Sequence, residues 1–104
     1  MRTGYSVLRE LKLKNFIPTA GDYGLKDVEF ENFIRFLERK GFIERVLWVK
    51  DAYSLRPARL TPKGLSLLEE YSGLESEYPA ERTSLKPWVE LDKILYSNGA
   101  EEAD

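Results

Sequence analysis

The sequence contains neither cysteine nor histidine in its 104 residues. This absence excludes disulfide bonds, thiol nucleophiles and cysteine–histidine zinc sites, and it also excludes Ser-His triads and imidazole acid–base catalysis. No apolar run approaches the roughly 18 residues that a membrane span requires. The N-terminal segment has no hydrophobic stretch of the signal-peptide kind. We therefore expect a cytoplasmic protein.

The residue patterns of an active site are also missing. Carboxylates are frequent in the last third of the chain, but none of them is paired with a second ligand type at metal-binding spacing. Gly21 and Gly24 do not make a phosphate-binding loop, and Pro62-Lys63-Gly64 lacks the upstream glycines of one. No base is visible for a serine or tyrosine nucleophile. We therefore expect no enzymatic activity, no catalytic residue, no metal and no cofactor.

The composition is that of one folded domain with an uneven charge. Hydrophobic residues make up 42% of the chain and aromatic residues 12%, which is enough for a packed core. The formal net charge is −2, but residues 1–64 contain 13 basic and 8 acidic side chains, whereas residues 65–104 contain 3 and 10. Such asymmetry is typical of a basic binding module with an acidic tail, or it reflects solvated helices of unequal charge.

Two elements are predicted before the strongest helix. Residues 3–14 are expected to form a helix, because their apolar residues recur at helical spacing. Pro18 disfavours helix at the residue before it and so ends this segment. Residues 19–23 are expected to form a short second helix or an irregular turn, with Gly24 as the corner that follows it.

The strongest helix is predicted over residues 27–40. Its apolar residues occur at positions i, i+3, i+4 and i+7, so they form one stripe that faces a core. These residues are Phe30, Phe33, Ile34 and Leu37. Asp27 is expected to cap the first turn, the basic residues of the last turn suit the helix dipole, and Gly41 is expected to end the helix.

A β-hairpin is predicted after this helix. Residues 42–50 and 53–60 are rich in β-branched and aromatic residues, so we expect two strands joined by a turn at 51–52, with Pro57 at an edge or a bulge. Both faces of the first strand are apolar, so one face must meet something besides the core. We expect a C-terminal helix to cover it, and a second chain is the next candidate.

A third helix is predicted after the hairpin, with Thr61 as its cap, Pro62 at its first position and Gly73 at its end. The element order predicts an α+β fold that is mainly helical, namely a winged helix-turn-helix with a two-stranded wing hairpin and a C-terminal tail helix. The predicted organisation is a winged-helix domain at 1–73, an acidic linker at 74–85, an amphipathic C-terminal helix at 86–99 and a disordered tail at 100–104.

A set of glycine, apolar and basic positions runs through most of the chain. Its members are Gly24, Phe30, Phe36-Leu37, Arg39, Gly41-Phe42-Ile43 and Leu60-Thr61-x-Lys63-Gly64. In these positions the chain resembles the small YjcQ-like winged-helix proteins of Gram-positive bacteria and their phages. Residues 37–43 and the Leu-Thr-x-x-Gly motif are also similar to MarR-like and PadR-like regulators. The resemblance implies a winged-helix fold and little about activity, because the family is largely uncharacterised.

The helix at 27–40 occupies the position of a recognition helix. The side opposite its apolar stripe carries Asn32, Arg35 and Arg39, which we predict to contact DNA. Asparagine can read adenine, and arginine can read guanine or bind phosphate. Three acidic residues in the first two turns would repel phosphate, so a solvated face on a structural helix is the alternative.

Basic residues of the hairpin are predicted to bind the phosphate backbone without reading sequence. They are Lys50, Arg56 and Arg59. Each phosphate contact would contribute about −0.9 to the slope of the logarithm of the binding constant against the logarithm of the salt concentration. The alternative is that they protect edge strands from aggregation. We therefore predict a winged-helix protein that binds duplex DNA and regulates transcription.

The alternative function is a non-catalytic protein–protein interaction module, such as a phage or prophage accessory factor, because fold alone does not determine function. The helix at 27–40 is near-neutral, with four acidic and three basic residues, and the C-terminal part of the chain is acidic. A protein interface would use Trp48, Trp88, Leu91 and Leu95. The C-terminal helix either forms a homodimer, which we favour for so short a chain, or docks on its own domain. No membrane partner is expected.

Overall fold

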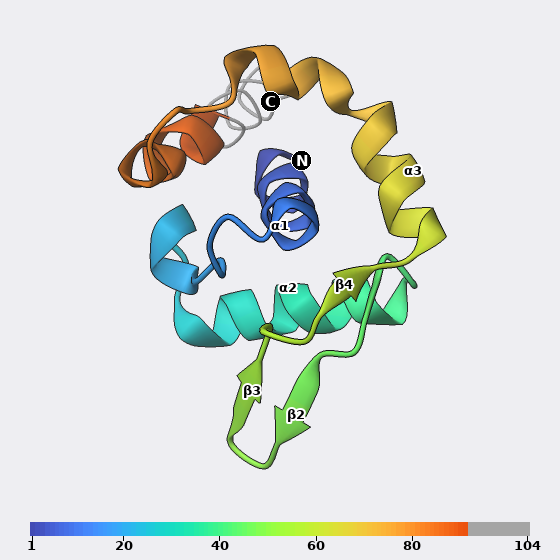
Figure 1. The fold of residues 1–104 in the computed structure, drawn as a ribbon. Helices are drawn as coiled ribbons and strands as arrows, with labels where there is room; N and C mark the ends of the chain where they lie inside the picture. Colours follow the sequence, from blue (N-terminus) through green and yellow to red (C-terminus); the bar gives the residue numbers. More distant parts are fainter. Residues whose placement is uncertain (92–104) are drawn as a thin grey trace, which may run out of the picture.

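Figure 1 shows the chain in a computed structural model that describes residues 1–91. The elements in chain order are α1 (Arg2–Leu13), η1 (Ala20–Tyr23), α2 (Asp27–Arg39), β1 (Ile43–Glu44), β2 (Leu47–Val49), β3 (Ala52–Ser54), β4 (Arg59–Leu60), α3 (Pro62–Glu70), η2 (Ser72–Glu77) and η3 (Arg82–Ser84). Residues 85–91 are also helical. The fold is α+β and mainly helical, as predicted, and two small antiparallel sheets pair β1 with β4 and β2 with β3. Within residues 1–91, none of the helices has both the length and the apolar character needed to cross a bilayer.

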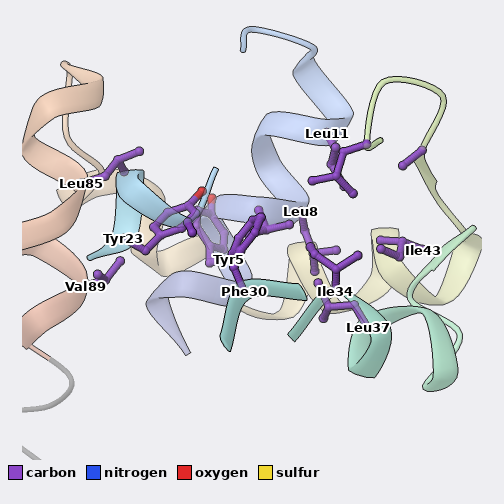
Figure 2. Close-up of a cluster of buried hydrophobic side chains, with 14 of the residues drawn as sticks. Tyr5, Leu8, Leu11, Tyr23, Phe30, Ile34, Leu37, Ile43, Leu85 and Val89 are labelled. Atoms are coloured by element: carbon purple, nitrogen blue, oxygen red, sulfur yellow. The ribbon is translucent and has the colours of Figure 1, made fainter. Parts of the chain in front are cut away.

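The helix α1 lies at the centre of the molecule (Figure 1). Its apolar residues are buried at helical spacing, as predicted, and they meet side chains from every larger element. Figure 2 labels the cluster members Tyr5, Leu8, Leu11, Tyr23, Phe30, Ile34, Leu37, Ile43, Leu85 and Val89. Because this cluster includes residues from both ends of the described chain, one core stabilises all of it.

The helix α2 has the predicted apolar stripe but a different cap. Asp27 is already the first helical residue, so the prediction that Asp27 caps the helix is wrong. The carboxylate of Glu29 instead accepts the backbone N–H of Lys26 at 2.8 Å, which satisfies a donor of the first turn. Gly41 ends the helix as predicted, with a φ of +82°. The buried residues of the stripe are Phe30, Ile34 and Leu37.

The prediction of one continuous strand over residues 42–50 is wrong. The strand is divided at Arg45, whose φ of +67° lies in the left-handed region. A residue in this conformation bends the strand, so β1 pairs with β4 while β2 turns away to pair with β3. The result is a β2–β3 hairpin that projects from the body beyond α2 (Figure 1).

The returning strand predicted at 53–60 is also divided, into β3 and β4. Between them the carbonyl of Leu55 accepts the backbone N–H of Ala58 at 3.0 Å, and Pro57 lies inside this turn. The hairpin turn lies at 50–51 and not at the predicted 51–52, because Val49 pairs with Ala52.

The helix α3 begins as predicted and ends earlier. The Oγ1 atom of Thr61 accepts the backbone N–H of Gly64 at 3.0 Å, and Pro62 is the first helical residue. The helix ends at Glu70, with Tyr71 as its cap, so the predicted end at Gly73 is wrong. The 3₁₀ helix η2 follows directly, and its residue Glu75 is bonded to Arg9 of α1.

The segment predicted as an acidic linker, residues 74–85, packs against α1. The carboxylate of Glu75 accepts hydrogen bonds from Arg9 of α1, with an Nε–Oε1 distance of 2.8 Å. Tyr78 packs against the core of the molecule. We call residues 72–91 the C-terminal strap, because Figure 1 shows them passing from α3 over α1 to η1.

The helical residues 85–91 lie against α1 and η1, and the side chain of Lys86 covers Gly24. Its buried residues are Leu85, Trp88 and Val89. The expectation that this helix covers an apolar face of the hairpin is therefore wrong for the described residues, since its apolar side is used against α1. The remainder of the helix predicted at 86–99 and the tail at 100–104 lie outside the described residues.

Candidate nucleic-acid interface

The three predicted DNA-contacting residues of α2 lie on one exposed face. Asn32, Arg35 and Arg39 are all exposed, whereas the opposite side of the same helix packs into the core. This placement follows from the helical spacing of the apolar stripe, which directs the intervening polar residues to solvent. The exposed face therefore offers one amide and two guanidinium groups to a ligand.

A contact between Arg35 and Trp48 joins this face to the hairpin. The guanidinium carbon of Arg35 lies 4.0 Å from the centroid of the Trp48 ring, which is a cation–π contact. The indole Nε1 of Trp48 donates to the carboxylate of Glu38 at 2.9 Å, and the ring lies 5.2 Å from that of Tyr53. These contacts hold the β2–β3 hairpin against α2, so the helix face and the hairpin form one surface.

Three acidic residues of α2 are engaged by groups of the molecule itself. Glu29 caps the helix start, and Glu38 accepts from Trp48. Glu31 forms an i,i+4 ion pair with Arg35, with an N–O distance of 3.3 Å. An exposed pair of this kind contributes only about 0.3–0.5 kcal/mol. A phosphate could therefore compete with Glu31 for the guanidinium of Arg35.

Arg39 lies one turn further along the same face. Its guanidinium is 6.0 Å from the ring of Phe36, and the ammonium of Lys40 is 5.9 Å from the same ring. Within residues 1–91, Arg39 forms no ion pair. Two adjacent cations at the C-terminal end of α2 therefore remain available to an anionic partner.

The predicted phosphate contacts of the hairpin are not gathered in one place. Lys50 is exposed in the β2–β3 turn. Arg56 is exposed between β3 and β4, where it lines a hollow together with Lys14 of α1. Arg59 pairs with Glu44 across the β1–β4 sheet, with an N–O distance of 2.6 Å. Of these three cations, Lys50 lies in the same hairpin as Trp48, against which Arg35 stacks.

A curated protein of Bacillus subtilis (strain 168), "Uncharacterized protein YjcQ", is 30% identical to this chain over 88 residues. The matched region covers 82% of this chain and 92% of that protein. The chain belongs to the YjcQ family. This membership confirms the YjcQ-like resemblance, whereas the similarity to MarR-like and PadR-like regulators stays a prediction. No family model and no solved structure matches this YjcQ-family chain.

The residues predicted for a protein interface are dispersed over this YjcQ-family chain. Trp48 is half-buried beneath Arg35, and Trp88 is buried against Tyr78, with ring centroids 5.2 Å apart. Leu91 is exposed, and Leu95 lies outside the described residues. Both tryptophans are therefore used inside the molecule, and neither presents its ring as a free docking surface.

Sequence reasoning missed a polar cluster between α1 and the C-terminal strap. The carboxylate of Glu75 accepts from the Tyr5 hydroxyl at 2.6 Å and from both Nε and Nη2 of Arg9. The hydrogen bonds from Arg9 and Tyr5 lower the pKa of Glu75 below its ordinary value. Burial, together with the bond to Glu75, raises the pKa of Tyr5 to about 12. About 65 residues separate the partners in sequence, so no local pattern could have indicated the cluster.

A buried carboxylate extends this cluster into the core. Glu10 is almost completely buried, and its Oε2 accepts from the Tyr78 hydroxyl at 2.6 Å and from Arg9 at 2.7 Å. Burial and the bond to Glu10 raise the pKa of Tyr78. At the other end of the strap, Arg82 donates to Asp22 of η1 at 2.6 Å. Both groups of bonds fix the strap to the body.

Proposed function

We propose that this YjcQ-family chain is a winged helix that binds duplex DNA and regulates transcription. The order α1, η1, α2 and β2–β3 hairpin is the order of a helix-turn-helix followed by a wing. In this proposal α2 enters the major groove, and Lys50 at the hairpin turn contacts the phosphate backbone. Asn32 and Arg35 meet base edges, and Arg39 meets a base or a phosphate.

The observation that carries the proposal is the stacking of Arg35 on Trp48. It lies at the junction of α2 with the hairpin, at 4.0 Å, and it orders a guanidinium on the exposed face that also carries Asn32 and Arg39. Ordering a long side chain before binding reduces the entropy that the complex would otherwise lose. A guanidinium held in this way is suited to a bidentate contact with guanine.

Substitutions on α2 test the proposal. We expect Arg35→Ala and Arg39→Ala each to weaken binding to a selected duplex by about 1–3 kcal/mol, because each removes a base or phosphate contact. Lys50→Ala should weaken binding to all duplexes alike and reduce the salt slope by about 1. The measurement is fluorescence anisotropy with a labelled duplex enriched from a random-sequence pool, over a series of salt concentrations.

The matched control is Lys12→Ala, which removes one exposed positive charge from α1, where Lys12 lines a hollow with residues of α3. It should leave the affinity within about threefold of the parent chain, since it contacts no DNA in this arrangement. An equal loss in the Lys12→Ala and Arg35→Ala variants would contradict a specific role for α2. Failure to enrich any duplex from the pool would contradict DNA binding altogether.

The second candidate function is a non-catalytic protein-interaction module. The specific observation in its favour is the outer face of the hairpin, where Leu47 is 53% exposed and Val49 is 55% exposed. Apolar side chains on an exposed strand suit a protein partner better than a phosphate backbone. A heparin column at moderate salt separates the two candidates: retention favours DNA, and passage without retention favours a protein partner.

A further inference from the structure

An apolar side chain begins the exposed face of α2 that carries the predicted DNA contacts. Val28, in the first turn of the helix, is 61% exposed. Residues 28, 32, 35 and 39 are separated by four, three and four positions, which places them on one side of a helix. The other three are Asn32, Arg35 and Arg39. The face predicted to contact DNA therefore includes a valine as well as an amide and two guanidinium groups.

The folding of the chain does not account for this valine. The apolar stripe of α2 lies on the opposite side of the helix, where Phe30 and Ile34 are almost completely buried. An exposed side chain removes little apolar surface from water, and a β-branched residue is a poorer helix former than alanine. A valine at this position therefore favours a role in contact with a partner.

The DNA of the proposed function offers one apolar group in its major groove. Thymine presents its C5-methyl group there, whereas the other three bases are read through hydrogen-bond donors and acceptors. Proteins recognise this methyl group by apolar contact. Val28 has the chemistry that this contact requires, and its side chain has no donor or acceptor with which to read another base.

The position of Val28 along α2 also suits a base contact. The N-terminal residues of a recognition helix are those that meet base edges. Val28 precedes Asn32 by about 6 Å along the helix axis, whereas successive base pairs are about 3.4 Å apart. The carboxylate of the adjacent Glu29 is held at the helix start by the backbone N–H of Lys26, at 2.8 Å. Val28 and Asn32 are therefore spaced to reach base pairs that are one or two steps apart.

We propose that Val28 contacts the C5-methyl group of a thymine that lies one or two base pairs from the pair contacted by Asn32. This inference rests on the proposed function, because it requires α2 to lie in the major groove. It goes further by naming part of the target sequence. A duplex with thymine at this position binds more tightly than the same duplex with another base there, so Val28 is a specificity-determining residue.

A double-mutant cycle that removes methyl groups from the protein and from the DNA tests the proposal. The duplex is the one that the parent chain enriches from a random-sequence pool, and each thymine is replaced in turn by deoxyuridine, which lacks only the methyl group. The protein variant is Val28→Ala, which retains the helix because alanine is the better helix former. Val49→Ala is the matched control, since Val49 is 55% exposed but lies on the hairpin. Fluorescence anisotropy gives the Kd of each combination.

At one thymine, we expect deoxyuridine to weaken binding of the parent chain about three- to tenfold, which is the loss expected for one methyl contact. The Val49→Ala variant should show the same loss. The Kd of Val28→Ala should change by less than about twofold at this position, because the contact is already absent from that variant.

Two outcomes would overturn the inference while DNA binding by the chain stands. In the first, deoxyuridine affects Val28→Ala and the parent chain equally at every thymine. In the second, Val49→Ala loses the effect of deoxyuridine as Val28→Ala does, so that the coupling is not specific to Val28. If the parent chain enriches no duplex, the proposed function itself fails, and the inference fails with it.

Discussion

At the scale of a single residue, Gly64 determines how α3 meets the rest of the molecule. A Cβ atom on Gly64 would lie 2.0 Å from the carbonyl oxygen of Phe42. The same oxygen accepts the backbone N–H of Thr61 at 3.1 Å, so it cannot move without losing that bond. The glycine of the Leu-Thr-x-x-Gly motif is therefore required by a close approach of two backbones.

We expect Gly64→Ala to lower the free energy of unfolding by at least about 2 kcal/mol, because the clash is with backbone and not with a flexible side chain. Chemical denaturation measures this change. The control is Gly73→Ala in η2, where a Cβ would meet nothing within 4 Å. It should alter stability by no more than about 0.5 kcal/mol. Similar losses in the two variants would show that the close contact is not the cause.

At the scale of the element, the C-terminal strap depends on charged hydrogen bonds. Those from Arg9 and Tyr5 lower the pKa of Glu75. Burial opposes the shift at Asp22, but hydrogen bonds from Arg82 and Thr19 lower its pKa overall. A carboxyl group with a lowered pKa in the folded state stabilises the fold above its ordinary pKa. That contribution is lost as the pH falls through the folded value.

The free energy of unfolding should therefore decrease as the pH is lowered from about 5 to about 2. Glu75→Gln should lower the free energy of unfolding at pH 7 by about 0.5–1 kcal/mol, a small value because Glu75 is exposed to solvent. The same substitution should make the free energy of unfolding depend less on pH. Glu70→Gln, an exposed position on α3, is the matched control and should change neither. Denaturant titrations at several pH values measure both effects. An unchanged pH slope in Glu75→Gln would contradict the role of this carboxylate.

At the scale of the whole molecule, the described chain shares one buried core. The buried cluster includes Leu85 and Val89 from the strap together with residues of α1, α2 and β1 (Figure 2). A segment that shares a core with the rest of the chain unfolds with it. The strap is therefore expected to unfold together with the hairpin, although the two lie at opposite ends of the molecule (Figure 1).

The two tryptophans report on these two ends. Trp48 lies in the hairpin and Trp88 in the strap, so Trp48→Phe leaves a strap reporter and Trp88→Phe leaves a hairpin reporter. In each variant, the thermal midpoint from fluorescence should agree with that from far-UV circular dichroism within about 2 °C. A strap signal that melts well below the circular dichroism transition would show that the strap unfolds as a separate unit.

Much of the fold was predictable because it depends on local patterns. Helical spacing of apolar residues predicts α1 and the stripe of α2, and the Thr61-Pro62 pair predicts the start of α3. The end of α2 at Gly41 is equally local. The break at Arg45 was not predictable, because a left-handed conformation at a non-glycine residue is imposed by the pairing of strands on either side.

The candidate site was predictable only in part. The exposed face with Asn32, Arg35 and Arg39 follows from the helical period, which is a property of the sequence alone. The stacking of Arg35 on Trp48 and the pairing of Arg59 with Glu44 depend on how the hairpin folds back. From the sequence alone, Arg35 and Arg59 were both predicted to contact DNA, although one stacks on Trp48 and the other pairs with Glu44.

Local chemistry in the sequence determined the helices, most of their ends and the polar side of α2, because these depend on neighbours within a few positions. Only the tertiary structure decided that the acidic C-terminal segment is a strap bound to α1 and η1, since its partners lie 60 or more residues away. It also decided which cations remain exposed. Packing brings distant charges together, and that placement is not contained in any local pattern.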